Sequence, residues 1–445
     1  MVTTTRKLAG AVLLAATLAL AACSGTSAGA SAHTKFPTEK VKLTMWWWGD
    51  QEAPGAQKYV DAAIAAYEKK RPNVTIDAVL QTTDGLVPSF QTAAASKTGP
   101  DLEYFWGGTN ALTPAWKKQI APISDYLPKS ELSHYLNATE ETYDGKVWTA
   151  PWYVQPSFPL LVRKDVLAKN GLTVPTTWNQ LMSTCDALSA KGVTTIAGGV
   201  KDGWFGGWLY SILGSQDLSS QKDVLAASVG TQSFTSAKQA EWWKRLAESK
   251  KHGCWNNDIN SLELYQAQQR FVDGSAAMTI TAGTDAPNFV AKAGGDANVQ
   301  VMAMPSWAKG PYAGKLGSSS QTLGITSWSK YPQVGADFIK FLHTPAELNA
   351  WYAATGAMPA DDRFDTSQVT SPSKKALFDM AAKGSPYLEN YIPPQLDSDA
   401  VFKNVQLVLQ GSTSASAAAA DMEATAKRLR TTDRTLVKNF TVWAR

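Results

Sequence analysis

A run of aromatic, carboxylate and amide side chains near the start of the chain is the segment best suited to binding chemistry. It reads Trp46-Trp47-Trp48-Gly49-Asp50-Gln51. The faces of sugar rings carry C–H bonds that pack on flat aromatic rings, and their hydroxyl groups need partners such as Asp, Asn or Gln. The segment offers both kinds of group. Because alternate side chains of a strand point to opposite faces, two of the three indoles are expected in the core.

Constellations for catalysis are missing from the sequence. The four histidines, His33, His134, His252 and His343, are far apart, and none has a partner at metal-ligand spacing. There is no His-Glu-x-x-His, no phosphate-binding Gly-x-x-x-x-Gly-Lys and no Gly-x-Ser-x-Gly nucleophile turn. We therefore predict no catalytic residue, no metal ligand and no cofactor. A pair of carboxylates for glycoside hydrolysis can lie far apart in sequence, so a secreted glycoside hydrolase stays open as the enzyme alternative.

The elements around the aromatic segment predict an open α/β sheet. Val41–Trp47 is a β-type run, and apolar residues alternate with polar ones from Val74 to Leu80. Between these strands, Val60, Ile64 and Tyr67 repeat at helical spacing. Such short connections imply parallel strands covered by helices. Ligands of open α/β sheets bind outside the carboxyl ends of the strands, where Trp48 to Gln51 follow the first strand.

The alternation of helix and strand signals continues along the chain. Thr177 is placed to cap a helix that begins at Trp178, and Gly274 to end one that contains Phe271. No long linker divides the chain after residue 36, which favours two lobes that share crossovers. Further helices are predicted at about 86–96, at Trp178–Ala190, at Ala237–Lys251 and from Pro332 onward, and further strands near 101–106 and at Ala276–Ile280, Val299–Met304 and Leu323–Thr326.

Composition restricts the class of protein. The 445 residues are 44% apolar and 18% charged, as in a globular protein. The net charge is +4, and Arg6 and Lys7 supply two of those charges, so the body lacks the basic excess of a nucleic-acid binder. Tryptophan is abundant, with 17 residues. We expect no nucleic acid as partner.

The N-terminus has the layout of a secretory signal. Two cations precede an apolar run that ends in Leu20-Ala21-Ala22-Cys23. A helix of about 15 residues spans about 22 Å, less than the roughly 30 Å of a bilayer core, so a membrane-spanning helix is the weaker interpretation. The terminal motif resembles the lipobox of bacterial lipoproteins, in which the cysteine is lipidated. An ordinary signal peptide with an incidental Cys23 is the alternative.

The two other cysteines leave two alternatives open. An exported protein meets an oxidising compartment, so Cys185 and Cys254 can pair as a disulfide. Cys185 shares a predicted helical face with Leu181 and Leu188, and Cys254 follows Gly253, so both can also be buried and unpaired.

Several short motifs, each weak by itself, follow one another in a specific order over nearly the whole exported chain. Together they indicate a family resemblance. The sequence resembles the family 1 extracellular solute-binding proteins of carbohydrate ABC importers, the group that includes maltose-binding protein. The motifs are Leu43-Thr44-Met45-Trp46 with Gly49-Asp50, Gly99-Pro100-Asp101-Leu102, Tyr143-Asp144-Gly145-Lys146-Val147 before Ala150-Pro151, Lys164-Asp165, Gly171-Leu172, Pro175-Thr176-Thr177-Trp178, Phe271-Val272-Asp273-Gly274-Ser275-Ala276-Ala277-Met278, Leu323-Gly324-Ile325, Ala336-Asp337-Phe338-Ile339-Lys340-Phe341-Leu342 and Thr355-Gly356-Ala357-Met358-Pro359-Ala360.

The resemblance implies a fold and a domain layout. The fold is α/β, two-lobed and periplasmic-binding-protein-like (class II), with a ligand cleft between the lobes. Residues 1–22 would be the signal peptide and 23–37 a flexible tether that begins at lipidated Cys23. Lobe one would comprise residues 38–153 and 300–343, and lobe two residues 154–299 and 344–445, with crossovers near Val154, Val299 and Thr344.

The resemblance also implies a function. The protein would be a monomeric lipoprotein exported to the outer face of the cell membrane, where it captures a sugar or oligosaccharide and delivers it to the permease subunits of an ABC transporter, without enzymatic activity. A receptor for a polyol or a glycerol phosphodiester is the alternative within binding proteins. The expected ligand contacts are Trp48, Asp50, Gln51, Trp106, Thr109, Asn110, Trp152, Tyr153, Gln155, Trp204 and Trp208.

Two departures from the family pattern add two expected contacts. Many relatives carry a stacking tryptophan where this chain has Asp285, and often a glycine pair where it has Ser318-Ser319-Ser320. We therefore expect Asp285 and Ser319 to supply carboxylate and hydroxyl contacts on that side of the cleft.

Overall fold

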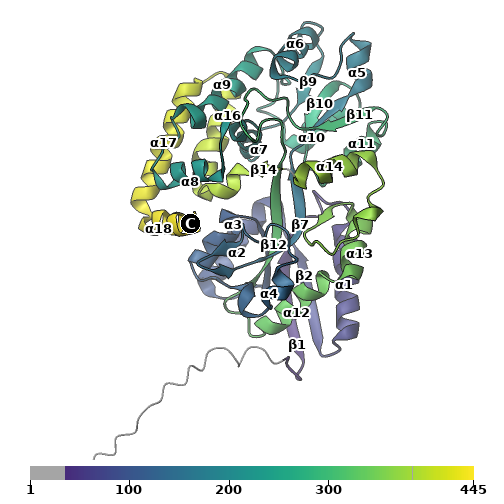
Figure 1. Ribbon diagram of the computed structural model, residues 1–445, viewed down its shortest axis with the longest axis vertical. Helices are drawn as coiled ribbons and strands as arrows, with labels where there is room; N and C mark the ends of the chain where they lie inside the picture. Colours follow the sequence, from purple (N-terminus) through teal and green to yellow (C-terminus); the bar gives the residue numbers. More distant parts are fainter. Residues whose placement is uncertain (1–35, 383, 445) are drawn as a thin grey trace, which may run out of the picture. The chain divides into compact units, whose positions relative to one another are not determined.

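The structure is a computed structural model that describes residues 36–382 and 384–444. The predicted signal peptide, Cys23 and nearly all of the predicted tether lie outside the described residues. Within them the strands form two larger sheets (Figure 1). We call the sheet that contains Val41–Trp47 and its covering helices the first lobe, and the other sheet with its helices the second lobe.

The sheet of the first lobe is mixed. Its main path runs β13-β7-β12-β3-β1-β2, with β4 and β14 also paired to β12. The three strands β2, β1 and β3 are parallel, while β12 is antiparallel to both β3 and β7. The strands are β1 (Val41–Trp47), β2 (Val74–Leu80), β3 (Leu102–Trp106), β4 (Ile120–Ala121), β7 (Ala150–Ser157), β12 (Gly317–Thr326), β13 (Met358–Pro359) and β14 (Ser385–Pro386).

The first strand–helix–strand unit is confirmed. The helix α1 (Ala56–Lys70) buries Tyr59, Val60, Ala63, Ile64 and Tyr67, as the helical spacing predicts. Its end is fixed to a helix from far along the chain, because the ring of Tyr67 lies 5.0 Å from that of Phe338. The other helices of this lobe are α2 (Thr83–Ser96), α3 (Thr109–Trp116), α4 (Lys129–Leu132), α12 (Pro332–Leu342) and α13 (Pro345–Thr355), and a hairpin of β5 (Thr142–Tyr143) and β6 (Lys146–Val147) follows α4.

The second lobe has a smaller sheet in the order β11-β8-β10-β9. Its strands are β8 (Leu160–Arg163), β9 (Thr194–Ala197), β10 (Ala276–Ile280) and β11 (Val299–Met302). Thr177 caps α6 as predicted, since its hydroxyl accepts from the Gln180 backbone N–H. Helices close to these strands are α5 (Lys164–Lys169), α6 (Trp178–Ser189), α10 (Leu264–Val272), α11 (Ala286–Lys292) and α14 (Pro372–Ala382).

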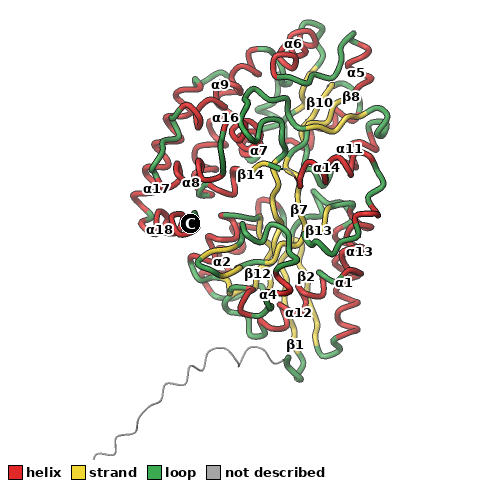
Figure 2. Tube along the Cα trace, viewed as in Figure 1, coloured by secondary structure: helices red, strands yellow, loops and turns green. Residues whose placement is uncertain are grey.

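A layer of helices covers one side of the second lobe (Figures 1 and 2). It buries large aromatic side chains, among them Trp242 and Trp243, whose rings lie 3.8 Å apart. Gly411 ends α16 in the left-handed conformation, which suits glycine. The layer consists of α7 (Phe205–Gly214), α8 (Gln221–Val229), α9 (Ala237–Lys251), α15 (Pro394–Leu396), α16 (Lys403–Gln410), α17 (Ala415–Thr432) and α18 (Arg434–Trp443).

Three expected lobe boundaries need correction. Residues 154–157 pair with β12 in the first sheet, and Val299–Met302 pairs with β8 in the second. After Thr344 the chain stays on the first lobe, where α13 packs on α1 and β13 pairs with β7. The crossovers therefore lie after Ser157, after Met302 and between Pro359 and Pro372, because α14 packs on β11 and α11 of the second lobe. Ser385 and Pro386 then pair briefly with β12 of the first sheet. Backbone pairing with distant strands decides these boundaries, and a local apolar pattern does not record it.

The structure joins Cys185 and Cys254 in a disulfide, with the two Cα atoms 4.7 Å apart. Both residues are fully buried. The bridge connects α6 with the segment that follows α9. In the described part of the chain, no helix combines the length and apolar character that a bilayer crossing requires.

Candidate functional site

The loop after β1 is held against the start of α2. The indole N–H of Trp48 donates to the hydroxyl of Thr83 over 3.0 Å, and that hydroxyl donates to the amide oxygen of Gln51 over 3.1 Å. Trp48 is buried, and its ring packs 5.5 Å from that of Trp106. Gln51 remains exposed. Trp48 therefore supports the neighbouring ring, and Gln51 faces solvent.

Asp50 is partly exposed and has one oxygen engaged. Its Oδ1 accepts from the backbone N–H of Gln57 at the start of α1, over 2.9 Å. Gly49 precedes it with φ of 139°, and a Cβ at Gly49 would lie 2.7 Å from the hydroxyl of Tyr153. Glycine thus allows the loop to approach β7 and present Asp50 at the sheet edge.

The loop after β3 touches both lobes. Thr109 is fully buried, and its hydroxyl donates to the backbone oxygen of Ile392, which lies in the second lobe, over 2.8 Å. Trp106 and Asn110 are partly exposed, and both line a cavity described below. The Thr109 hydroxyl is therefore committed to the protein, while Trp106 and Asn110 keep accessible surface.

The three predicted ligand contacts on β7, Trp152, Tyr153 and Gln155, are all buried. Trp152 lies in the core against Trp47 and Trp351, and Tyr153 shares a hydrogen bond of 3.3 Å with Tyr104. Gln155 is buried and accepts at its amide oxygen from Gln321 over 2.7 Å. Trp152 and Tyr153 therefore present little free surface.

Glu52 links the lobes, and no sequence pattern had pointed to it. Its Oε2 accepts from the Gln155 amide over 2.8 Å, and its Oε1 accepts from the Tyr265 hydroxyl of α10 over 3.3 Å. Burial raises the pKa of Glu52 to about 7, against the lowering effect of these two hydrogen bonds. Its position next to Gln51 in the same loop was the available signal.

The second lobe contributes an aromatic group around α7. Trp208 is buried and stacks on Phe158 with the ring centroids 3.8 Å apart. Trp204 is partly exposed and packs 5.1 Å from Trp208 and 5.5 Å from Tyr265. Among the six predicted aromatic contacts, only Trp106 and Trp204 retain partly exposed rings.

Asp285 and Ser319 are both buried. The Asp285 carboxylate accepts from the Asn288 amide over 3.1 Å, and burial raises its pKa to about 6. Its charge contributes to the raised pKa of Glu52, so the two carboxyls lie near each other. Ser319 accepts from the Asn390 amide over 3.4 Å.

Two further carboxyls lie beside this group. Glu389 fills the space over Gly207, because a Cβ at Gly207 would clash with its Oε1. Burial and the neighbouring Asp397 raise the pKa of Glu389, and burial raises that of Asp397 to about 7. Glu389 Oε2 and Asp397 Oδ1 are buried without a hydrogen-bond partner. We call Glu52, Asp285, Glu389 and Asp397 the interlobe carboxylates.

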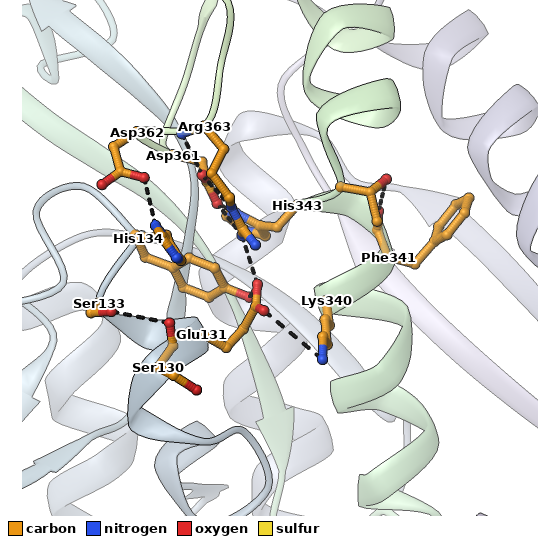
Figure 3. Close-up of polar contacts among 12 residues, drawn as sticks. Ser130, Glu131, Ser133, His134, Lys340, Phe341, His343, Asp361, Asp362 and Arg363 are labelled. Carbon is orange, nitrogen blue, oxygen red and sulfur yellow. Dashed lines mark hydrogen bonds and ion pairs between the residues drawn. The ribbon is translucent and has the colours of Figure 1, made fainter.

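No lysine or arginine neutralises the interlobe carboxylates by an ion pair within residues 36–382 and 384–444. In the same ranges no group of three or more His, Cys, Asp or Glu has the arrangement of a metal site. The structure does bring His343 to Asp361 and His134 to Asp362 (Figure 3). These pairs lie in the first lobe among ion-paired side chains, and neither includes a predicted ligand contact.

A cavity of about 260 Å³ adjoins Trp106 and Asn110. Its walls come from α2, β3 and α3 of the first lobe and from residues 393–395 and the α17–α18 hairpin of the second. The predicted site thus borders a hollow with walls from both lobes.

Comparison with protein families decides the class of this molecule. Residues 62–378 match the model of the bacterial extracellular solute-binding proteins. The chain belongs to this family. A Pyrococcus horikoshii protein named as an uncharacterized ABC transporter extracellular-binding protein is 21% identical over 408 residues, which cover 86% of this chain and 88% of the relative.

Two solved structures share the fold. A chitin oligosaccharide binding protein superposes with a TM-score of 0.78 at 21% identity, covering 87% of this solute-binding protein and 98% of its own chain. A protein described with xylan utilization by Caldanaerobius polysaccharolyticus gives 0.75 at 21% identity, covering 86% and 99%. The two-lobed α/β fold of periplasmic solute-binding proteins, predicted from the resemblance, is confirmed.

Proposed function

We propose that this solute-binding protein captures a sugar or oligosaccharide between its two lobes and delivers it to the permease of an ABC transporter. The observation that carries the proposal is the pair of partly exposed indoles, Trp106 on the first lobe and Trp204 on the second. Each is supported from behind by another ring, Trp48 and Trp208 respectively. Rigid indole faces suit the C–H faces of sugar rings.

The polar groups around the indoles supply partners for hydroxyl groups. Asp50, Gln51 and Asn110 are at least partly exposed, so they are the direct contacts in this proposal. The remaining assigned residues act as deeper contacts or as supports for the two stacking rings. They are Trp48, Thr109, Trp152, Tyr153, Gln155, Trp208, Asp285 and Ser319.

Hydrogen bonds between the lobes provide the closure that delivery requires. The Tyr265 hydroxyl of the second lobe donates to Glu52, and the Tyr391 hydroxyl donates to Glu140 over 3.0 Å. In the proposal these bonds break and form as the lobes hinge, and the closed, liganded form is the one that the permease recognises.

The proposal includes export and anchoring. Residues 1–22 act as the signal peptide, Cys23 carries the lipid, and residues 23–37 tether a monomeric body to the outer face of the cell membrane. Cys23→Ser should release the protein into the medium. Continued membrane association of that variant, with no lipid-modified peptide in the wild type by mass spectrometry, contradicts the anchor.

The direct test is binding by calorimetry after a thermal-shift screen against mono- and oligosaccharides, since a ligand of the folded state raises the midpoint. Trp106→Ala and Trp204→Ala should each weaken affinity by about 30-fold, or about 2 kcal/mol, as for a stacking anchor. Trp307→Ala is the matched control, because Trp307 is also partly buried, but its indole N–H donates to Leu213 and its ring packs against Arg245, neither of which is an assigned residue. Equal affinities for all four proteins contradict the site.

Two alternatives remain as outcomes of the same experiments. A polyol or a glycerol phosphodiester that raises the midpoint, where sugars do not, favours a receptor for that solute. Release of reducing sugar from an oligosaccharide by the purified protein favours a glycoside hydrolase.

A further inference from the structure

The helix α18 carries apolar side chains along one face. Leu436, Phe440 and Trp443 follow one another at spacings of four and three residues, which place them on one stripe of a helix. Leu436 and Phe440 are buried, and Trp443 is partly exposed. Asp433 caps the helix, because its carboxylate accepts from the backbone N–H groups of Thr435 and Leu436. The start of α18 is therefore fixed directly after the end of α17.

The base of α18 belongs to the second lobe. The helix packs on α8 and α17, and α17 in turn packs on α9 and α16 of the same helical layer. Leu436 and Phe440 are part of the hydrophobic core of that lobe. When the lobes move, α18 therefore moves with the second lobe.

The other end of α18 reaches the first lobe. The ring of Phe440 lies 5.2 Å from the ring of Trp116 in α3, and the ring of Trp443 lies 6.4 Å from it. The hydroxyl of Tyr143 in β5 donates to the amide oxygen of Asn439 over 3.0 Å. One helix of the second lobe thus holds two separate elements of the first. We call these contacts the α18 junction.

Each lobe contributes a tryptophan to the other at the α18 junction. Trp116 of the first lobe packs against the hydrophobic core of the second. Trp443 of the second lobe packs against a first-lobe cluster that contains Phe105 and Leu112. Trp443 also stacks on Tyr391, with the ring centroids 5.2 Å apart and the planes 8° apart. Aromatic pairs stabilise a contact beyond the area that they bury, so the junction resists separation of the lobes.

The α18 junction is not covalent. The chain completes its crossovers before α18 begins, since the last strand to pair with the first sheet, β14, ends at Pro386. Figure 1 shows α18 and α3 on one side of the central strands β7 and β12, and α13 and α14 on the other. The contacts of α18 with the first lobe can therefore break and form again as the lobes hinge, while the crossovers stay intact.

We propose that α18 is a strap that fastens the second lobe to the first and must detach before a ligand enters or leaves the space between them. The strap holds the lobes together both with and without ligand. A contact that is equally strong in the two forms leaves the affinity unchanged, but it slows the opening that precedes entry and release. The inference rests on the proposed function only in taking a sugar as the ligand.

The kinetic test uses Trp443→Ala, which removes the ring contacts of the strap with Trp116 and Tyr391. Stopped-flow tryptophan fluorescence is recorded with the sugar that gives the largest thermal shift. Association and dissociation should both become about fivefold faster, the factor expected for the loss of one aromatic pair. The affinity should change by less than about threefold. A large loss of affinity with an unchanged association rate would make Trp443 a ligand contact and overturn the inference.

Trp328→Ala is the matched control. Trp328 is partly exposed like Trp443 and packs against the same first-lobe cluster. Its ring stacks on Phe90 and its indole N–H donates to Pro100, both in the first lobe. Both rates should equal those of the wild type. Rates that rise equally in the two variants, or in neither, overturn the inference.

A milder variant keeps the test decisive if Trp443→Ala does not fold. Tyr143→Phe retains the ring and removes the hydrogen bond to Asn439. Both rates should rise by a smaller factor than in Trp443→Ala. If Trp443→Ala does not fold, unchanged rates in Tyr143→Phe overturn the inference.

Scattering without ligand separates the inference from the proposed function. Small-angle X-ray scattering should give a larger radius of gyration for Trp443→Ala than for the wild type and Trp328→Ala, because a detached strap lets the lobes open. If no sugar binds but this difference is found, the proposed function fails and the strap stands. Equal radii for the three proteins overturn the inference and leave the proposed function intact.

Discussion

Buried carboxylates occur in two regions of this protein, and their surroundings differ. In the first lobe, Glu131 and Asp361 each accept from the Arg363 guanidinium over 2.6 Å (Figure 3). Between the lobes, Glu389 and Asp397 share a hydrogen bond with each other, and each has a buried oxygen without a partner. Both regions remove carboxylates from water, and only the first supplies a cation.

The ion-paired region, which we call the Arg363 network, keeps its charges. Burial alone would raise the pKa of Asp361, but hydrogen bonds from Arg363 and His343 outweigh it and lower the pKa to about 2. His343 stacks on Tyr135 with the rings 3.8 Å apart, and burial lowers its pKa. The network ties residues 361–363 to α4 and to the end of α12 (Figure 3).

This difference distinguishes buried charges that stabilise the fold from buried carboxylates that can bind another molecule. A paired buried charge holds elements together, and removing its partner is strongly destabilising. Unpaired buried carboxylates with raised pKa values are typical of functional sites, because they are kept available for another molecule. We propose that the interlobe carboxylates have such a role, at a cost in stability.

The largest expected effect is on the Arg363 network. Arg363→Met should lower the free energy of unfolding by about 3–5 kcal/mol, because Glu131 and Asp361 lose their cation while remaining buried. Urea unfolding measures it. Arg428→Met is the control, since its pair with Asp399 is largely exposed and should contribute less than about 1 kcal/mol. Similar losses for the two variants would contradict a structural role for the Arg363 network.

Between the lobes, the carboxyl of Glu52 should make the protein less stable as the pH rises. The pKa of Glu52 is about 7 in the folded protein and ordinary in the unfolded chain, so its favourable contribution is present below about pH 4 and is lost as the pH rises through 7. Wild-type stability should therefore fall between pH 5.5 and 8. Glu52→Gln should remove about 2 kcal/mol of that fall, since one pKa unit corresponds to about 1.4 kcal/mol. Asp361, with a pKa of about 2, should contribute nothing in this window.

Glu389→Gln should change stability at pH 8 little and weaken sugar binding. Burial and Asp397 raise the pKa of Glu389, so its side chain is uncharged and shares a hydrogen bond with Asp397 that an amide can also donate. Urea unfolding and calorimetry on the same sample measure both quantities. A variant that is destabilised like Arg363→Met would show that Glu389 has a structural role.

The smallest expected effect is at Asp50, a partly exposed residue two positions before Glu52. Asp50→Asn keeps an acceptor for the Gln57 N–H, so the unfolding midpoint should hardly change. Sugar affinity should fall by a few-fold, because a charged acceptor binds hydroxyls more strongly than a neutral one. An unchanged affinity would remove Asp50 from the site and leave the buried carboxyls alone in it.

Local patterns predicted much of the fold. Strand alternation and helical spacing located β1, α1 and β2, and Thr177 indicated the start of α6. The position of the Trp48–Gln51 loop at the carboxyl end of β1 followed from those elements. These features depend on residues within a few positions of one another, so a single sequence contains them.

The tertiary structure decided which of these side chains are free and which charges are paired. Glu52 meets Gln155 and Tyr265, and His343 meets Asp361, only because strands and helices from distant parts of the chain pack together. Burial and the distance to a cation are set by that packing, and no spacing in the sequence encodes them. For the same reason the sequence predicted six aromatic contacts without showing which of them are buried. The fold leaves two of these rings, Trp106 and Trp204, partly exposed.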